Sequence, residues 1–226
     1  LEKLKRNLKV SEIIDQVLTV QREHPERRIS NIVFMGMGEP LANLPAVTEA
    51  LVRMISPEGF GISPRKITVS TAGLVPQIEQ FLATPTQANL SISLNATTDA
   101  VRDKIMPKVN KLYPIKVLLT ALKKTPLPSR RRVTFEYVLL AGVNDSLADA
   151  IRLVRLAHGI RCKFNLIPFN EFPESHYRRP SDDQIEQFQK TLLKGGLVAT
   201  LRKNRGRDIL AACGQLSGEN KGPSPP

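Results

Sequence analysis

The strand-like run Asn31-Ile32-Val33-Phe34-Met35 leads directly into the turn Gly36-Met37-Gly38-Glu39-Pro40. This order predicts a buried strand that ends in a glycine turn carrying a single carboxylate, that of Glu39. A barrel of alternating strands and helices keeps its active site at this end of its strands, because the loops that follow the strands meet there. The stretch therefore predicts a ligand-binding edge in a sheet of parallel strands.

Three later strand-like segments end in the same way. Residues 66–69 run into Ser70-Thr71-Ala72-Gly73, residues 89–92 into Ser93-Leu94-Asn95-Ala96, and residues 164–168 into Phe169-Asn170. Taken singly, each polar side chain could have a purely structural role, either hydrogen-bonding the backbone at a strand end or capping a helix. Because the whole set shares one end of the strands, a ligand site is the favoured interpretation.

Helix-like segments alternate with these strands, which predicts an α/β fold with a parallel sheet under helical cover. The expected helix starts are at Ser11, at Asn43 with Pro45, at Val75, at Ser146 and at the capping box Ser181-Asp182-Asp183-Gln184. Residues 98–124 should form helical turns in two parts, because they contain Pro107 and Pro114. Residues 133–140 and 198–201 should be strands. Polar residues after several different strands favour a barrel or part-barrel over a doubly wound sheet, whose ligand groups gather at one switch point.

Length and composition set broad limits on the protein. The 226 residues suit one domain, which we expect over residues 1–216, followed by a disordered tail over residues 217–226. The excess of 33 Lys+Arg over 21 Asp+Glu, a net charge of +12, favours a polyanionic partner, although each arginine cluster taken alone reads as solvated surface. Two cysteines do not make a disulfide framework, and no membrane span or signal peptide is visible. A cytoplasmic protein is expected. The charged start at Leu1 reads as the middle of a domain, so the chain is expected to be a fragment.

Two candidate site residues have competing structural interpretations. Glu39 could bind an ammonium group of a ligand, or its carboxylate could accept backbone N–H groups within the turn, and the residues favour neither reading. Cys213 follows the basic run at residues 202–207, which would favour its thiolate form, although a small buried residue is the commoner case. Cys162 opens a strand and is expected to be buried. The glycines at 36 and 38 do not make a dinucleotide-binding fingerprint, because the third glycine position holds Leu41.

An ordered set of motifs resembles the radical S-adenosylmethionine enzymes that methylate adenine C2 in 23S rRNA, the RlmN/Cfr group. Besides the strand-end turns already quoted, these motifs are Arg6-Asn7-Leu8, Ser11-Glu12-Ile13-Ile14, Met106-Pro107, Glu136-Tyr137-Val138, Gly142-Val143-Asn144-Asp145 and Ala211-Ala212-Cys213-Gly214-Gln215-Leu216. The resemblance extends from Arg6 to Leu216. It implies a partial six-fold βα barrel of the radical S-adenosylmethionine type, lacking its first strand and cluster loop.

The resemblance also implies roles for residues. It places S-adenosyl-L-methionine against the residues that match the family's cofactor contacts, with Glu39 at the ammonium: Gly38, Glu39, Ser70, Ser93, Leu94, Asn95 and Asn170. Cys213 matches the cysteine that carries the methyl group as an intermediate, which is nucleophilic catalysis. The expected partners are 23S rRNA, tRNA as a further candidate, and an electron donor such as flavodoxin or ferredoxin. A monomer is expected, in the bacterial cytoplasm or in a plastid.

One feature of the family has no match in this sequence. The family holds a 4Fe–4S cluster with three cysteines spaced CxxxCxxC before the Arg-Asn-Leu motif, and only residues 1–5 precede that motif here. No metal ligands are therefore assigned in the chain, and the chain alone is expected to be inactive. A cluster-free relative that binds RNA or S-adenosylmethionine without catalysis is the alternative. An unrelated barrel enzyme acting on phosphorylated metabolites would need a phosphate-binding glycine loop after the last strands.

Overall fold

The computed structural model describes residues 5–35, 38–127, 131–172 and 175–202. Six parallel strands in this part form one sheet in the order in which they occur in the chain. They are β1 (Ile32–Phe34), β2 (Ile67–Thr71), β3 (Asn89–Ser93), β4 (Val133–Leu139), β5 (Cys162–Pro168) and β6 (Ala199–Leu201). The α/β class and the parallel, part-barrel sheet predicted from the sequence are confirmed.

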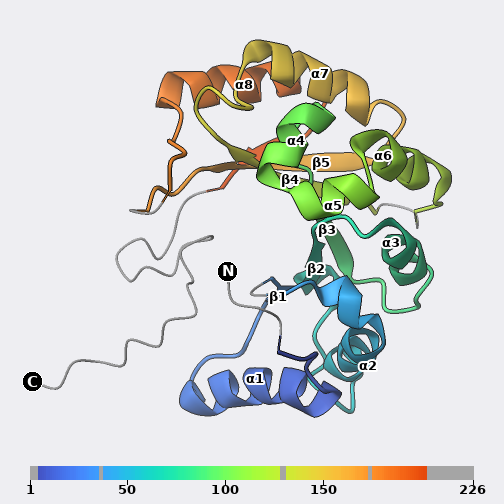
Figure 1. Cartoon of the computed structure of the whole chain (residues 1–226). Coiled ribbons are helices and arrows are strands. Elements are labelled where there is room, and N and C mark those ends of the chain that lie inside the picture. The colour runs from blue at the N-terminus through green and yellow to red at the C-terminus, as the bar shows by residue number, and fades with distance from the viewer. Residues whose placement is uncertain (1–4, 36–37, 128–130, 173–174, 203–226) are drawn as a thin grey trace, which may run out of the picture.

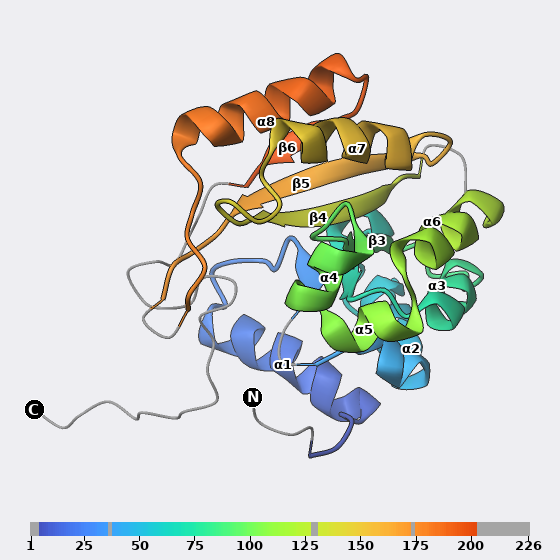
Figure 2. The same ribbon diagram turned by 45° about the horizontal axis from the view of Figure 1, so that its top comes forward.

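The first helix precedes the first strand, the later helices lie between successive strands in the chain, and all lie outside the curved sheet (Figure 1). They are α1 (Val10–Glu23), α2 (Leu44–Ile55), α3 (Val75–Leu82), α4 (Asp99–Ile105), α5 (Pro107–Leu112), α6 (Ile115–Lys124), α7 (Leu147–Ala157) and α8 (Asp182–Lys194), with short 3₁₀ helices at η1 (Pro40–Asn43) and η2 (Pro64–Lys66). Figure 2 shows α4 and α5 in front of the sheet, with α7 and α8 packed side by side above β4 and β5. No helix in the described ranges is long and apolar enough to cross a membrane.

The two faces of the sheet differ in character because successive strand residues point to opposite sides. On β4, Phe135 and Tyr137 are fully buried, and the Tyr137 ring stacks on Phe188 of α8 at 5.5 Å between centroids. This face carries the apolar core under the helices. Thr134 and Glu136 point to the opposite, inner face, which is polar over several strands. The sheet therefore separates an apolar outer layer from a polar interior.

The N-cap of the first helix lies two residues before Ser11, the predicted N-cap, so that prediction is wrong. Lys9 is the N-cap of α1, and the Glu12 carboxylate accepts the Lys9 backbone N–H at 2.7 Å. The Arg6 guanidinium donates to the same carboxylate and lowers the pKa of Glu12 to about 2. A side chain inside the first turn thus reaches back and fixes the start of the helix.

The other predicted boundaries fare better. Ser146 and Ser181 each accept a backbone N–H from the first turn of α7 and α8, as predicted. The second half of the predicted capping box is absent, because the Gln184 side chain donates instead to the Asp145 carbonyl at 2.5 Å. Residues 98–124 form three helices rather than two, since each of the two prolines begins or precedes a new one.

Candidate functional site

The carboxyl ends of the strands lie along one edge of the sheet, and hydrogen bonds link each end to the next. The first link is made by Glu39, in the turn after β1. One carboxylate oxygen of Glu39 accepts the Leu41 backbone N–H at 3.0 Å, and the other accepts the Ala72 N–H, after β2, at 2.7 Å. Glu39 therefore does accept backbone N–H groups, which was the structural alternative to ligand binding. Each oxygen keeps a second lone pair, so the ligand-binding interpretation stays open.

The second link is Arg102 of α4, whose side chain is fully buried at 0% exposure. Its guanidinium donates to the carbonyl of Ala72, after β2, at 3.0 Å and to that of Ser93, at the end of β3, at 3.4 Å. Its Nε donates to the Leu94 carbonyl at 3.2 Å. Burial lowers the pKa of Arg102, and Asp99 with Asp103 opposes that shift. Arg102 thus links two of the predicted site turns, the one after β2 and the one after β3.

Asn95 makes the third link, from β3 to β4. It has a left-handed backbone at φ +56°, and its amide oxygen accepts the Val138 N–H at 2.9 Å. The fully buried Asn144 donates from one amide nitrogen to the carbonyls of Asn95 and Val138, both at 2.7 Å. Asn144 therefore holds Asn95 in a conformation that an asparagine adopts at modest cost.

The predicted cofactor residues differ in how much of their chemistry remains available. The Leu94 side chain is buried, and its backbone N–H and carbonyl are both bonded within the protein. The Asn95 amide donates to Met106 Sδ at 3.3 Å and accepts from β4, so both of its polar atoms have partners. Ser70 is buried, and Ser93 is partly exposed. Gly38 would meet no atom within 4 Å if it carried a Cβ.

Asn170 lies after β5 at the same edge of the sheet. The β5 register with β4 pairs Leu139 with Pro168, and the Phe169 N–H donates to the Leu139 carbonyl at 3.2 Å. Asn170 itself is buried at 7% exposure. The five polar positions predicted to gather, Glu39, Ser70, Ser93, Asn95 and Asn170, therefore share one edge. That they contact S-adenosylmethionine stays a prediction.

The inner face next to this edge carries polar side chains in rows. The strand register places Ser70, Ser91, Thr134 and Lys163 in one row, and Ser93, Glu136, Asn165 and Thr200 in the next. A parallel sheet buried on both faces normally has near-continuous apolar strands. Polar rows on one face therefore indicate a surface made to receive a polar ligand.

The cysteines give no metal site in the described part of the chain. Cys162 is a free thiol, 8% exposed, and burial raises its pKa to about 11. The predicted burial of Cys162 is confirmed. Cys213 and the predicted tail lie outside the described residues. Within those ranges no group of three or more His, Cys, Asp or Glu could hold a metal ion, so the described residues do not fit a 4Fe–4S cluster.

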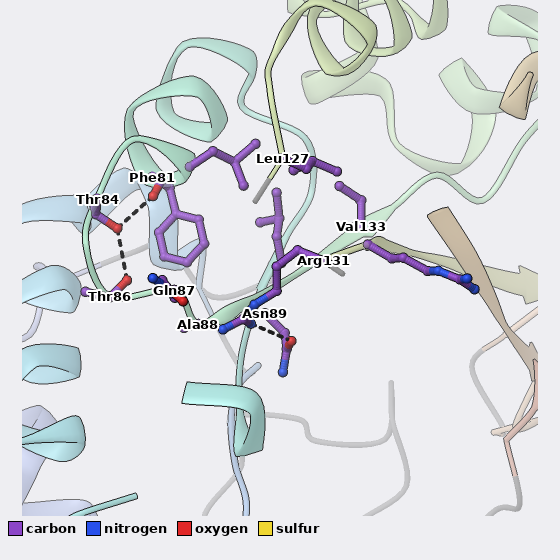
Figure 3. A pocket seen from close by; sticks show the side chains of 12 residues that line it. Phe81, Thr84, Thr86, Gln87, Ala88, Asn89, Leu127, Arg131 and Val133 are labelled. Carbon is purple, nitrogen blue, oxygen red and sulfur yellow. Dashed lines mark hydrogen bonds between the residues drawn. The ribbon is translucent and has the colours of Figure 1, made fainter. Parts of the chain in front are cut away.

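A small cleft lies at the opposite end of the sheet, at the amino ends of β3 and β4 (Figure 3). It has an empty volume of about 450 Å³ including open solvent, and Phe81, Leu127 and Val133 contribute apolar walls. Arg131 donates to the Asn89 side chain at 3.1 Å across its mouth. The cleft contains none of the predicted site residues, so the candidate site is defined by the strand ends and the polar face.

Three residues that position or line this site were not assigned a role from the sequence: Arg102, Asn144 and Glu136. Asn144 and Glu136 lie within quoted motifs, but a motif does not say what its members contact. Glu136 had one further signal, since a carboxylate that alternates with Phe135 and Tyr137 must face away from the core they form.

Comparison with known proteins agrees with this geometry. The profile of the radical SAM superfamily matches residues 3–154. Two proteins named dual-specificity RNA methyltransferase RlmN, from Geotalea uraniireducens and Geobacter sulfurreducens, are 56% and 55% identical to the chain over 96% of its length. The chain spans 62% and 59% of those two relatives.

Solved structures show the same relationship. The crystal structure of a radical SAM methyltransferase from Sphaerobacter thermophilus superposes with a TM-score of 0.90 at 44% identity, covering 96% of this chain and 64% of that one. A domain of the pyruvate-formate lyase-activating enzyme from Bacteroides vulgatus shares the fold, with a TM-score of 0.57 at 18% identity, over 77% of this chain and all of that one. The chain therefore belongs to the radical SAM superfamily, and it is similar to RlmN proteins over nearly its whole length.

Proposed function

We propose that this chain is part of an RNA methyltransferase that methylates C2 of an adenine in 23S rRNA by radical S-adenosylmethionine chemistry. The main support is the 56% identity to an RlmN protein over 96% of the chain, with the motif residues arranged along one sheet edge. The dual specificity in the relatives' name supports a second RNA substrate, which we take to be tRNA. The net charge of +12 suits a polyanionic substrate.

The strand-end edge and the polar inner face fit S-adenosylmethionine. When bound, this cofactor supplies the methyl group and, together with a 4Fe–4S cluster, the radical chemistry that an unreactive carbon such as adenine C2 requires. Glu39 would orient the ammonium group, because two backbone N–H groups fix its carboxylate while lone pairs remain. Ser70, Ser93 and Asn170 would offer polar groups along the same edge, and Gly38, Leu94 and Asn95 would shape it.

Cys213 would carry the methyl group on its thiolate before transfer to RNA. The basic run at residues 202–207 favours that thiolate, since nearby cations lower a thiol pKa. Cys162 cannot take this role, because it opens β5 at the end of the sheet away from the candidate site and its pKa is raised by burial. A reduced flavodoxin or ferredoxin would supply electrons.

The proposal is tested by deleting the gene and measuring 2-methyladenosine in digested 23S rRNA by mass spectrometry. We expect the modification to disappear and to return with the wild-type gene. It should not return with Cys213→Ala, and it should return with the control Glu186→Gln, whose side chain is 60% exposed on α8 and pairs with Lys190. Unchanged 2-methyladenosine in the deletion strain would contradict the proposal, and copurification of the protein with RNA would then favour a non-catalytic binder.

A further inference from the structure

The segment over residues 98–124, which forms α4, α5 and α6, carries a large share of the positive charge of the chain. It contains six lysines and one arginine against two aspartates and no glutamate. This short segment therefore holds a net charge of +5, out of +12 for the whole chain. Four exposed lysines between α4 and the start of α6 form what we call the lysine surface: Lys104, Lys108, Lys111 and Lys116.

The two aspartates of the segment do not neutralise the lysine surface, because they face the buried Arg102. Burial lowers the pKa of Arg102, and Asp99 with Asp103 opposes that shift, so the two carboxylates offset the cost of burying the guanidinium. Asp99 also accepts the Ile115 N–H, and Asp103 accepts the side-chain amide of Asn110, both at 2.9 Å. Within the described residues, no ion pair includes a lysine of the lysine surface.

Other helices of the chain pair their cations with carboxylates. On α2, α7 and α8 a basic residue has an acidic partner three or four positions away, in the pairs Arg53–Glu49, Arg152–Asp149 and Lys190–Glu186. Such pairs stabilise a helix slightly, whereas like charges at the same spacing destabilise it. A surface that is only solvated usually mixes both signs, as these helices do, and a single-sign surface attracts ligands of the opposite charge. The lysine surface therefore indicates a polyanionic partner.

The lysine surface adjoins the candidate site. Met106 joins α4 to α5, and its sulfur accepts the side-chain amide of Asn95, a predicted cofactor residue, at 3.3 Å. Lys104 and Lys108 lie two residues on either side of Met106. The carboxylate at the start of α4 accepts a backbone N–H at the start of α6, which holds Lys116 near the same helix. Figure 2 shows α4 and α5 next to one another in front of the sheet. A polyanion bound to the lysine surface would thus pass beside the strand-end edge.

We propose that the lysine surface binds the phosphate backbone of the RNA substrate beside the nucleotide that is methylated. The inference rests on the proposed function, because it takes RNA as the substrate, and it adds which surface of this chain holds that RNA. A lysine ammonium is a point charge that suits phosphate oxygens. Phosphate contacts position a nucleic acid without reading its bases. The lysine surface would therefore hold RNA at the site whatever its sequence.

The test measures RNA binding by the full-length protein, with fluorescence anisotropy at several salt concentrations. One probe is a 23S rRNA fragment that contains the target adenine, and the other is an unrelated RNA of the same length. The variant is the double substitution Lys108→Gln with Lys111→Gln, and the matched control is Lys123→Gln with Lys124→Gln. Both remove two exposed lysines from the same segment. Lys124 ends α6, about 12 Å along the helix axis from Lys116, so the control lies away from the site.

The expected result is a smaller salt dependence in the variant. Each phosphate contact that is lost reduces the slope of log affinity against log salt by about 0.7 to 0.9, so Lys108→Gln with Lys111→Gln should reduce it by about 1.4 to 1.8. Raising the salt from about 50 to about 200 mM should then weaken the variant about 7- to 12-fold less than the wild type. The change should be the same for both RNAs. The control should keep the wild-type slope, and so should Lys108→Arg with Lys111→Arg, which retains the charge.

Each other outcome has a definite meaning. Equal slope changes in the variant and the control would overturn the inference, since net charge rather than a local contact would then explain them. A wild-type slope in the variant overturns it as well, and leaves the proposed function standing if the wild type still binds and methylates the rRNA fragment. A loss confined to the fragment with the target adenine would overturn it in favour of base contacts. Wild-type protein that binds neither RNA at any salt concentration would overturn the proposed function, and with it this inference.

Discussion

Replacing Arg102 by methionine should destabilise the protein by about 3–5 kcal/mol, which is the range for breaking a buried charged network. The side chain is 0% exposed and donates five hydrogen bonds, to the carbonyls of Leu94, Tyr113, Ala72 and Ser93 and to the Asn110 side chain. Methionine fills much of the same volume but donates nothing. Each buried acceptor left without a partner costs about 1–3 kcal/mol, and relaxation keeps the total below the simple sum.

The measurement is urea unfolding followed by circular dichroism. Arg53→Met is the matched control, because Arg53 is exposed on α2 and pairs there with Glu49 of the same helix, so we expect a change of about 0.5 kcal/mol or less. Arg102→Lys should recover only part of the loss, since an ammonium cannot reproduce the planar fork of donors. A change below about 1 kcal/mol for Arg102→Met would refute the view that this side chain holds the site turns together.

Three further predictions concern other buried groups. Asn144→Ala should lower the free energy of unfolding in urea by about 2–4 kcal/mol, because it leaves three backbone groups without their side-chain partner. An unchanged free energy of unfolding would show that water replaces the amide. In a Cys213→Ser variant, the Cys162 thiol of the folded protein should react with a disulfide reagent at pH 8 far more slowly than the same thiol in the urea-unfolded protein. The reason is that burial raises the pKa of Cys162 to about 11, and equal rates in the two states would contradict its burial. Burial raises the pKa of Glu136, so the folded state favours the protonated form and wild-type stability falls as pH rises through that pKa. The unfolding free energy of Glu136→Gln relative to wild type should therefore be more favourable at pH 7 than at pH 4, and a difference independent of pH would count against the shift.

Local patterns were enough to predict the framework of the fold. The strands at residues 89–92 and 133–140 agree with β3 and β4 to within a residue. Residues 133–140 are rich in the β-branched and aromatic residues that mark strands. Ser146 and Ser181 cap their helices through contacts only three residues away. The shared strand-end edge followed from the parallel sheet itself.

Interactions between distant residues could not be read in this way. Arg102 appears in sequence as one more basic residue on a short helix, yet it bonds to carbonyls as far away as Ala72. Asn144 looks like a turn asparagine, yet it fixes Asn95 across 49 residues. Glu39 shows a further limit, since its backbone contacts and its proposed ammonium contact use different lone pairs of one carboxylate. Sequence patterns could not choose between two roles that are compatible.

Hydrogen exchange measured by mass spectrometry, with and without S-adenosylhomocysteine, tests the location of the cofactor site most directly. If the strand-end edge binds the cofactor, the ligand should slow exchange in peptides covering residues 70–73, 93–96 and 169–170. Peptides that line the cleft at the amino ends of β3 and β4, over residues 84–88 and 131–133, should be unaffected. Protection confined to the cleft peptides, with the strand ends unchanged, would contradict the account.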